Sequence, residues 1–203
     1  MLRIVIAGVV GAAIVFCAGA FNHMALGLEG RAFKEFAKDD EVRGFISKHE
    51  IKPGLYRFPA SPDGYEKMKG EEKKKAEVEW NERYKVGPSG LIVVAPTGED
   101  AMGPPQLIAE FITNVLAALI AAWLVANSAI SGSFVWRWAI VFSLGLFTWL
   151  STSASFGIWY RFPPAFIHDG LFCSMIEWGV AGLAIAAIAR PETTAPDPAS
   201  RAA

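Results

Sequence analysis

Four stretches of mostly apolar residues, each about 20 residues long, constrain the fold of this 203-residue chain more than any other feature. They cover residues 4–21, 106–125, 134–153 and 171–189. The first stretch carries no charge, and each of the others carries one: Glu110, Arg137 and Glu177. Because lipid offers backbone groups no hydrogen-bond partner, we expect each stretch to be a transmembrane helix.

The charged residues are gathered between the first and second apolar stretches. Residues 22–105 hold 29 of the 39 charged side chains. We therefore expect an all-α membrane protein with four transmembrane helices and a small α+β extracytoplasmic insertion. The expected parts are transmembrane helix 1 (1–21), the insertion (22–105), a three-helix transmembrane region (106–189) and a disordered cytoplasmic tail (190–203).

The first apolar stretch has two possible roles. Arg3 precedes it and Ala18-Gly19-Ala20 ends it, a pattern that also fits a cleaved signal peptide. The stretch is long for a signal peptide, which favours an uncleaved anchor. Lipidation of Cys17 is disfavoured, since the bulky Phe16 stands where a lipoprotein needs a small residue.

The positive charges of the short connections predict an orientation. With the N-terminus inside, the cytoplasmic side carries Arg3, Arg137, Arg190 and Arg201, and the short outer loop carries only Arg161. Short cytoplasmic loops are enriched in Lys and Arg, so both termini are expected in the cytoplasm. The expected location is a bacterial inner membrane.

The insertion shows signs of local structure. Residues 39–49 have apolar side chains at helical spacing, and residues 62–85 form a charged pattern typical of a surface helix. Two short apolar runs, at 55–58 and 91–95, are bounded by Pro or Gly and predict strands. Neither strand can cover its own edges, so we expect the run around Tyr56 to pair with 91–95.

Polar residues near the outer ends of the helices are the candidates for chemistry. The candidate cluster consists of His23, Glu110, Asn114, Arg161, His168, Asp169 and Glu177. Ionisable groups at membrane depth are costly and therefore point to a ligand, proton or metal site. The alternative is purely structural pairing, with Glu110 satisfied by the first turn of its helix and Glu177 paired with Arg161 or His23. No metal-ligand spacing such as HxxxH or ExxH occurs, so no metal and no cofactor is predicted.

Glu177 carries the sharpest structural expectation. It is placed about two turns into the last helix, roughly 9 Å along it. A carboxylate in lipid needs a partner, so Glu177 should face the other helices and reach a polar group. Cys17 and Cys173 both lie in the outer halves of their helices; apolar packing is favoured over a disulfide.

Four short motifs support a resemblance. They are Asn22-His23-Met24, GLYRFP at 54–59, GPSGL at 87–91 and WYRFPP at 159–164, ahead of a glycine-rich last helix. This combination resembles an uncharacterised family of small bacterial four-helix integral membrane proteins. The resemblance implies the four-helix architecture with an external insertion, and it implies no activity, ligand or catalytic residue.

The function expected first is a non-catalytic accessory or scaffold subunit of a larger membrane complex. No nucleotide, hydrolase, zinc-protease or haem motif occurs in the sequence, and small residues at four-residue spacing favour close helix packing. The expected partners are the lipid bilayer and other membrane protein subunits. Nucleic acid is not expected, because the net charge is −1. The alternative is a small transporter or ligand-binding membrane protein that uses the outer polar cluster; a membrane enzyme ranks third.

Overall fold

The computed structural model describes residues 1–98, 100, 102–130 and 132–190. The chain divides into two compact units. The first unit comprises Met1–Lys34 with Ala101–Ala203, and the second comprises Glu35–Asp100. The predicted disorder of the tail concerns residues 190–203, of which all but Arg190 lie outside the described residues.

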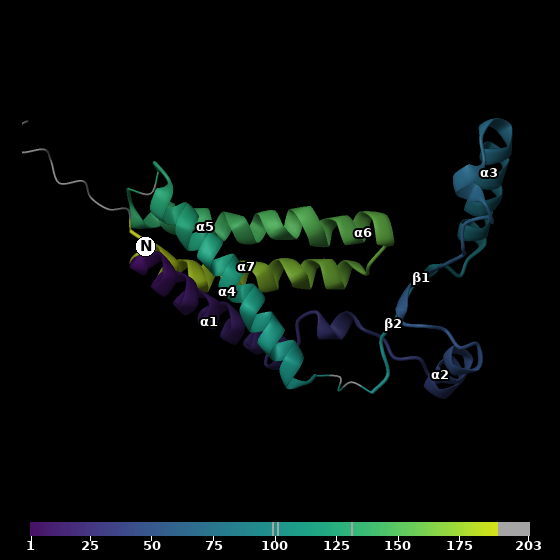
Figure 1. Ribbon diagram of the computed structural model, residues 1–203, viewed down its shortest axis with the longest axis horizontal. Helices are drawn as coiled ribbons and strands as arrows, with labels where there is room; N and C mark the ends of the chain where they lie inside the picture. The colour runs from purple at the N-terminus through teal and green to yellow at the C-terminus, as the bar shows by residue number, and fades with distance from the viewer. Residues whose placement is uncertain (99, 101, 131, 191–203) are drawn as a thin grey trace, which may run out of the picture. The chain divides into compact units, whose positions relative to one another are not determined.

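The first unit contains four helices that are long and apolar enough to cross a membrane (Figure 1). They are α1 (Leu2–Met24), α4 (Pro104–Asn127), the continuous span Phe134–Tyr160 and α7 (Pro164–Ile188). The third span consists of α5 (Phe134–Thr148), a π-helical turn (Trp149–Ser153) and α6 (Ala154–Tyr160). Four such helices in a mostly helical chain indicate a multi-pass membrane protein.

The last helix starts earlier than the hydropathy pattern predicts. It begins at Pro164 rather than Leu171, because proline suits the first turn of a helix, where its missing N–H leaves no bond unmade. His168 and Asp169 therefore lie within α7, not in an outer loop. The helix also tolerates Asp169 because that carboxylate has a partner, described below.

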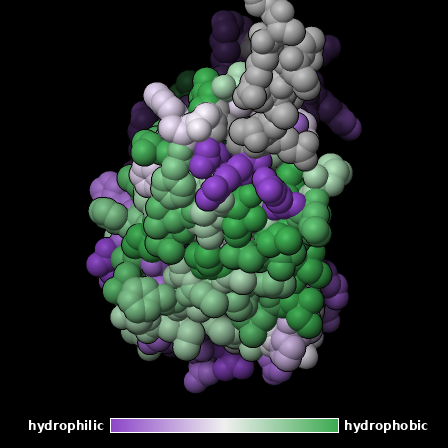
Figure 2. All heavy atoms as spheres, turned by 90° about the vertical axis from the view of Figure 1, so that its left-hand side faces the viewer, coloured by the Kyte–Doolittle hydropathy of each residue, from purple (hydrophilic) through white to green (hydrophobic). Residues whose placement is uncertain are grey.

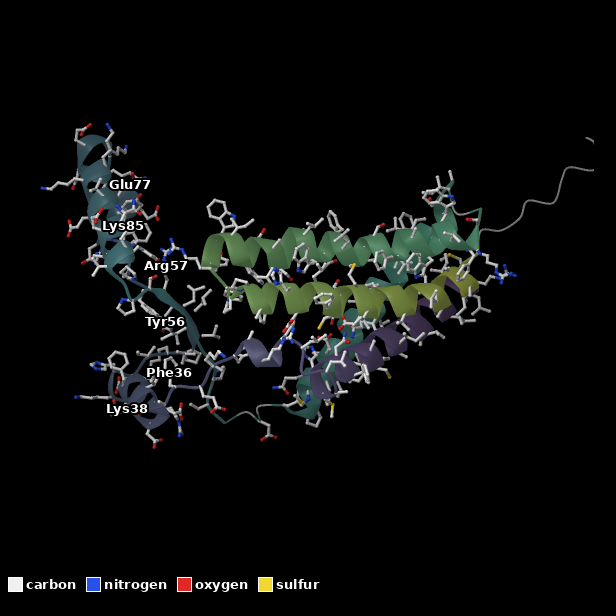
Figure 3. The ribbon with its side chains drawn as sticks, turned by 180° about the vertical axis from the view of Figure 1, so that it is seen from behind. Phe36, Lys38, Tyr56, Arg57, Glu77 and Lys85 are labelled. Carbon is white, nitrogen blue, oxygen red and sulfur yellow. The ribbon has the colours of Figure 1, made fainter. Side chains whose placement is uncertain are left out.

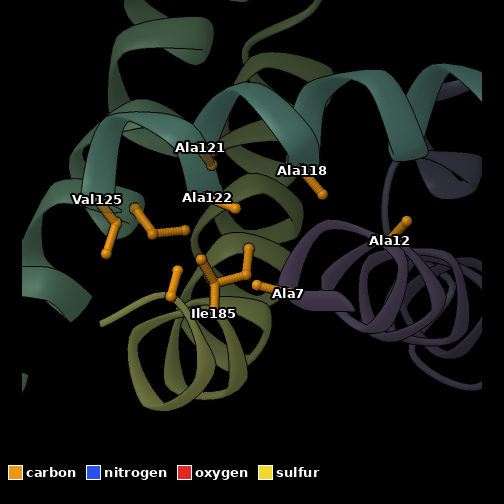
Figure 4. Close-up of a cluster of buried hydrophobic side chains, with 9 residues drawn as sticks. Ala7, Ala12, Ala118, Ala121, Ala122, Val125 and Ile185 are labelled. Atoms are coloured by element: carbon orange, nitrogen blue, oxygen red, sulfur yellow. The ribbon is translucent and has the colours of Figure 1, made fainter. Parts of the chain in front are cut away.

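Small residues let the helices of the first unit pack closely. The buried cluster shown in Figure 4 is built mainly of alanines. Its members are Ala7, Ala12, Ala118, Ala121, Ala122, Val125, Val141, Ile185 and Ala189. On α1, a Cβ added at Gly8 would lie 2.5 Å from Leu119, and one at Gly11 would lie 2.7 Å from Ile185. Glycine at these positions allows α4 and α7 to approach the α1 backbone.

Side-chain hydrogen bonds join α5 and its π turn to α7. The indole of Trp138 donates to the Gly179 carbonyl (2.9 Å), and the hydroxyl of Ser174 donates to the Gly145 carbonyl (2.9 Å). The Arg137 Nε donates to the Ala186 carbonyl (2.7 Å), and this arginine is buried. Many large apolar side chains of the helices are exposed, and Figure 2 shows apolar side chains over much of the face at which α1 begins.

The second unit holds the predicted two-stranded sheet. Strand β1 (Gly54–Phe58) pairs antiparallel with β2 (Gly90–Val94), and Tyr56 stands opposite Ile92. The predicted pairing around Tyr56 is therefore confirmed. Helix α2 (Asp39–Lys48) also forms where the apolar spacing predicts it.

The charged helix of the second unit is shorter than predicted. Helix α3 runs over Gly70–Val86, and the preceding residues form only a 3-10 turn, Tyr65–Lys67. The prediction of a helix from residue 62 is wrong because Gly64 and Gly70 take the left-handed backbone, with φ of 72° and 57°.

An aromatic cluster ties α3 to the strand. The indole of Trp80 donates to the Pro59 carbonyl (3.1 Å), and the Arg57 guanidinium lies 5.1 Å from the centre of the Trp80 ring. Figure 3 labels Arg57 on β1 and Glu77 on α3. The Tyr65 hydroxyl donates to Glu77 (2.6 Å), and this hydrogen bond is the main reason why the pKa of Tyr65 lies above its usual range.

Candidate functional site

A pocket of about 530 Å³ lies within the first unit. Side chains from α1, α4, the third span and α7 line it. It lies towards the ends of these helices where α1 finishes and α4 begins, since its lining includes Met24 and Leu107. Each of the four candidate spans thus contributes to one cavity.

The structure brings together four of the seven candidate residues in this pocket. His23, Glu110, Asn114 and Glu177 line it. The other three lie outside its lining. Arg161 and His168 are exposed, and Asp169 is buried in a separate ion pair.

Glu177 faces the other helices, as expected, and accepts a hydrogen bond. The Asn22 amide donates to Glu177 Oε1 at 3.0 Å, and Asn22 is 0% exposed. The hydrogen bond to Glu177 comes from Asn22 rather than from Arg161 or His23, because α1 continues past Phe21 and carries Asn22 into the helix packing. Gly19 lies beside the carboxylate, since a Cβ there would be in ordinary contact with Glu177 Oε1 at 3.4 Å.

The position of Glu177 along its helix also differs from the prediction. Since α7 begins at Pro164, Glu177 lies near the middle of a 25-residue helix. At 1.5 Å per residue, this is roughly 20 Å along the helix rather than 9 Å. Its carboxylate nevertheless lies close to the level at which α1 ends, since Asn22, two residues before the last residue of α1, donates to it.

Asn22 has an acceptor that is not used within the described part of the chain. Its Nδ2 donates to Glu177 and, at 3.5 Å, to the Cys173 carbonyl, whereas its buried Oδ1 has no hydrogen-bond partner there. A buried acceptor without a partner costs about 1–3 kcal/mol. The contact between α1 and α7 beside the pocket is thus polar, and one hydrogen-bond acceptor in it, Asn22 Oδ1, is left without a donor among the described residues.

The segment that follows α1 is fastened to the start of α7. Arg31 pairs with Asp169 through two bonds: Nε donates to Oδ2 (2.7 Å), and the terminal nitrogen contacts Oδ1. The backbone N–H of Glu29 also donates to Asp169 Oδ2 (3.0 Å). Asp169 is 0% exposed, so this bidentate pair compensates the buried charge. We call residues 25–34 the latch segment.

The latch segment places Glu29 in the pocket lining. Glu29 has a φ of 61°, a costly conformation for a non-glycine residue, and the bond from its N–H to Asp169 helps to hold it there. Its carboxylate lies 3.9 Å from His23 Nε2. Gly170 permits this approach, since a Cβ there would lie 3.1 Å from Glu29 Oε1.

The pocket is acidic and partly aromatic. Three carboxylates line it, those of Glu29, Glu110 and Glu177, and its described lining contains no Lys or Arg. Burial raises the pKa of Glu29; His23 opposes this shift, and the charge of Asp169 adds to it. The aromatic rings in the lining are those of Phe16, Trp149 and Trp178.

The π turn contributes directly to the pocket. Trp149 and Ser153 lie in it and line the cavity. The Trp149 indole donates to the Ile167 carbonyl (2.8 Å), which orients its ring against α7. Such turns interrupt the regular helix pattern and often occur at functional sites.

Sequence analysis did not select Asn22, Glu29 or Arg31 as site residues. Asn22 borders the first apolar stretch and belongs to the Asn22-His23-Met24 motif, and these two signals could have identified it. Glu29 and Arg31 belong to a segment rich in charge, so nothing in the sequence distinguishes them from solvent-exposed residues.

The described residues contain no group of three His, Cys, Asp or Glu side chains that could hold a metal ion. Cys17 is exposed and Cys173 is buried, and both are free thiols. Comparison with protein-family models, with curated proteins and with solved structures finds no match. Function is therefore inferred from the residues of the pocket.

Proposed function

We propose that this chain is a multi-pass membrane protein that binds a small ligand in the pocket between its four spans. The observation that carries the proposal is the convergence of His23, Glu110, Asn114 and Glu177 on one cavity. A cavity of about 530 Å³ that combines an apolar lining with a few polar groups has the usual form of a small-molecule site.

The arginine distribution supports a location in a bacterial inner membrane with both termini in the cytoplasm. In this orientation the pocket opens towards the extracytoplasmic side, because α1 ends and α4 begins there. Glu110 and Glu177 both lie towards this end of the spans: Phe111, next to Glu110, packs against Phe16 of α1, and Glu177 accepts a hydrogen bond from Asn22.

An accessory subunit of a membrane complex is the second candidate. The observation that favours it is the exposed apolar surface of the two-stranded sheet, where Leu55 is 67% and Val93 is 76% exposed. Exposed apolar side chains on a short sheet are typical of a surface that another protein covers.

Native mass spectrometry of the full chain, purified in mild detergent, tests the proposal. Ala20 lies on α1, is exposed and lines the pocket, so Ala20→Phe should fill the pocket mouth. Ala13→Phe is the matched control, since Ala13 is an exposed alanine two turns earlier on the same helix and outside the lining.

We expect a small molecule or lipid to stay bound to the wild type and to Ala13→Phe and to be lost from Ala20→Phe. Equal retention by all three proteins would contradict the pocket as the binding site. A stable assembly with other proteins and no retained small molecule would favour the subunit function instead.

A further inference from the structure

We infer that the ligand of this pocket is an organic cation, an ammonium group that carries apolar substituents. This inference depends on the proposed function and adds to it the chemical class of the ligand. It follows from the charge, the rings and the apolar walls of the pocket taken together.

The charge of the lining selects against anions. Glu29, Glu110 and Glu177 come from three different segments, the latch segment, α4 and α7, yet they line the same cavity. Within the described lining, His23 is the one residue that can supply a positive charge, and it lies 3.9 Å from Glu29. A ligand carboxylate or phosphate would meet like charges without a basic partner, which costs binding energy.

A cation with apolar substituents fits the remaining groups. A carboxylate and an ammonium group attract each other strongly where water is scarce. The faces of aromatic rings also attract cations, and Phe16, Trp149 and Trp178 are among the residues that line the pocket. Val15, Leu107 and Met24 provide apolar contacts for the ligand's carbon atoms.

The neutral side chains have a defined place in this arrangement. Asn114 lies one turn after Glu110 on α4, so both can contact one ligand group. Ser153 adds a hydroxyl to the lining, whereas the Ser174 hydroxyl is already engaged with Gly145. The oxygen atoms of these neutral side chains carry lone pairs, so they can lie against an ammonium group at the same time as a carboxylate.

The inference is tested with three probes of nearly the same shape. Benzyltrimethylammonium is a cation, neopentylbenzene is its neutral carbon isostere, and benzylsulfonate is an anion. Trp149 and Trp178 line the pocket, so tryptophan fluorescence of the purified full chain reports on binding. We expect the cation to bind at least about tenfold more tightly than either of the other two probes.

A charge-removing variant identifies the group responsible. Glu110→Gln keeps the side-chain shape and should weaken cation binding about tenfold while leaving the neutral probe unchanged. Glu79→Gln is the control, because it removes the same charge from an exposed position of α3 in the second unit. Equal affinity for the cation and its isostere, or tighter binding of the anion, would overturn the inference but leave the pocket as a ligand site.

Failure of the proposed function itself gives a different result. In that case none of the three probes binds, and Ala20→Phe does not change the retained small molecule.

When the cation binds, a comparison of vesicles identifies its source. Competition by phosphatidylethanolamine, but not by phosphatidylglycerol, identifies a lipid headgroup ammonium, and equal cation affinity in both vesicles identifies a free organic cation; both results support the ammonium class.

Discussion

The Asn22 amide donates to the Glu177 carboxylate at 3.0 Å and so joins α1 to α7 across 155 positions of sequence. Glu177→Gln should leave the protein folded, because an amide can still accept this bond. Glu177→Leu should lower the free energy of unfolding by about 1–3 kcal/mol, since Asn22 then loses its carboxylate acceptor inside the protein. Thermal unfolding in detergent measures both changes; an unaltered Tm for Glu177→Leu would show that the bond does not stabilise the fold.

The Arg31–Asp169 pair should hold the latch segment in place. Arg31→Ala leaves the Asp169 carboxylate with the Glu29 N–H as its one remaining hydrogen-bond donor among the described residues, so we expect a lower Tm. Arg31→Lys should recover only part of this, because lysine cannot make the bidentate contact. Lys34→Ala, at an exposed position nearby, is the control. Limited proteolysis between residues 25 and 34 should become faster in Arg31→Ala alone, and an unchanged cleavage rate would contradict the latch.

Close packing of α5 against α7 requires glycine at position 145. An alanine Cβ there would lie 2.9 Å from the Trp178 Cβ and 3.1 Å from the Ser174 carbonyl oxygen. Gly145→Ala should therefore destabilise the protein by about 1–3 kcal/mol, as overpacking of a tight core does. At Gly132 an added Cβ has no neighbour within 4 Å among the described residues, so Gly132→Ala should leave the Tm unchanged.

The proposed orientation can be tested by cysteine labelling of intact cells. In a background with Cys17 and Cys173 replaced by alanine, Lys75→Cys should react with an impermeant maleimide and Gly132→Cys should not. Residue 75 lies in the insertion and residue 132 in the connection between α4 and α5, so alternating spans place them on opposite sides. The reverse labelling pattern would show that the chain has the opposite orientation, with the pocket opening towards the cytoplasm.

The raised pKa of Glu29 predicts that the stability of the protein depends on pH. This pKa is raised by burial, with the charge of Asp169 adding to the shift and His23 opposing it. A carboxyl group whose folded pKa exceeds its unfolded value contributes stability at low pH and loses it as the pH rises through the folded pKa. Wild type and Glu29→Gln should thus have similar stability near pH 4, and the variant should gain in relative Tm towards pH 7. A constant Tm difference across this range would contradict the prediction.

The spans and the two strands follow from the sequence because both depend on neighbouring residues. A hydropathy window adds up transfer free energies along the chain, so it finds apolar helices without knowledge of their packing. The strands around Tyr56 and Ile92 are likewise short β-rich runs bounded by Pro or Gly, each with an edge to cover. The same local summation misplaced the start of α7, since Asp169 lowers the hydropathy of a turn that is helical.

Only the tertiary structure decided which polar residues belong together. Asp169 and Glu177 are eight residues apart on α7, yet one pairs with Arg31 outside the pocket lining and the other faces Asn22 and the pocket. The sequence by itself determined that such carboxylates need partners, because an unpaired charge in a low dielectric is costly. It did not determine the partners, because contacts across 138 and 155 positions depend on how the helices pack and where the chain returns after α1.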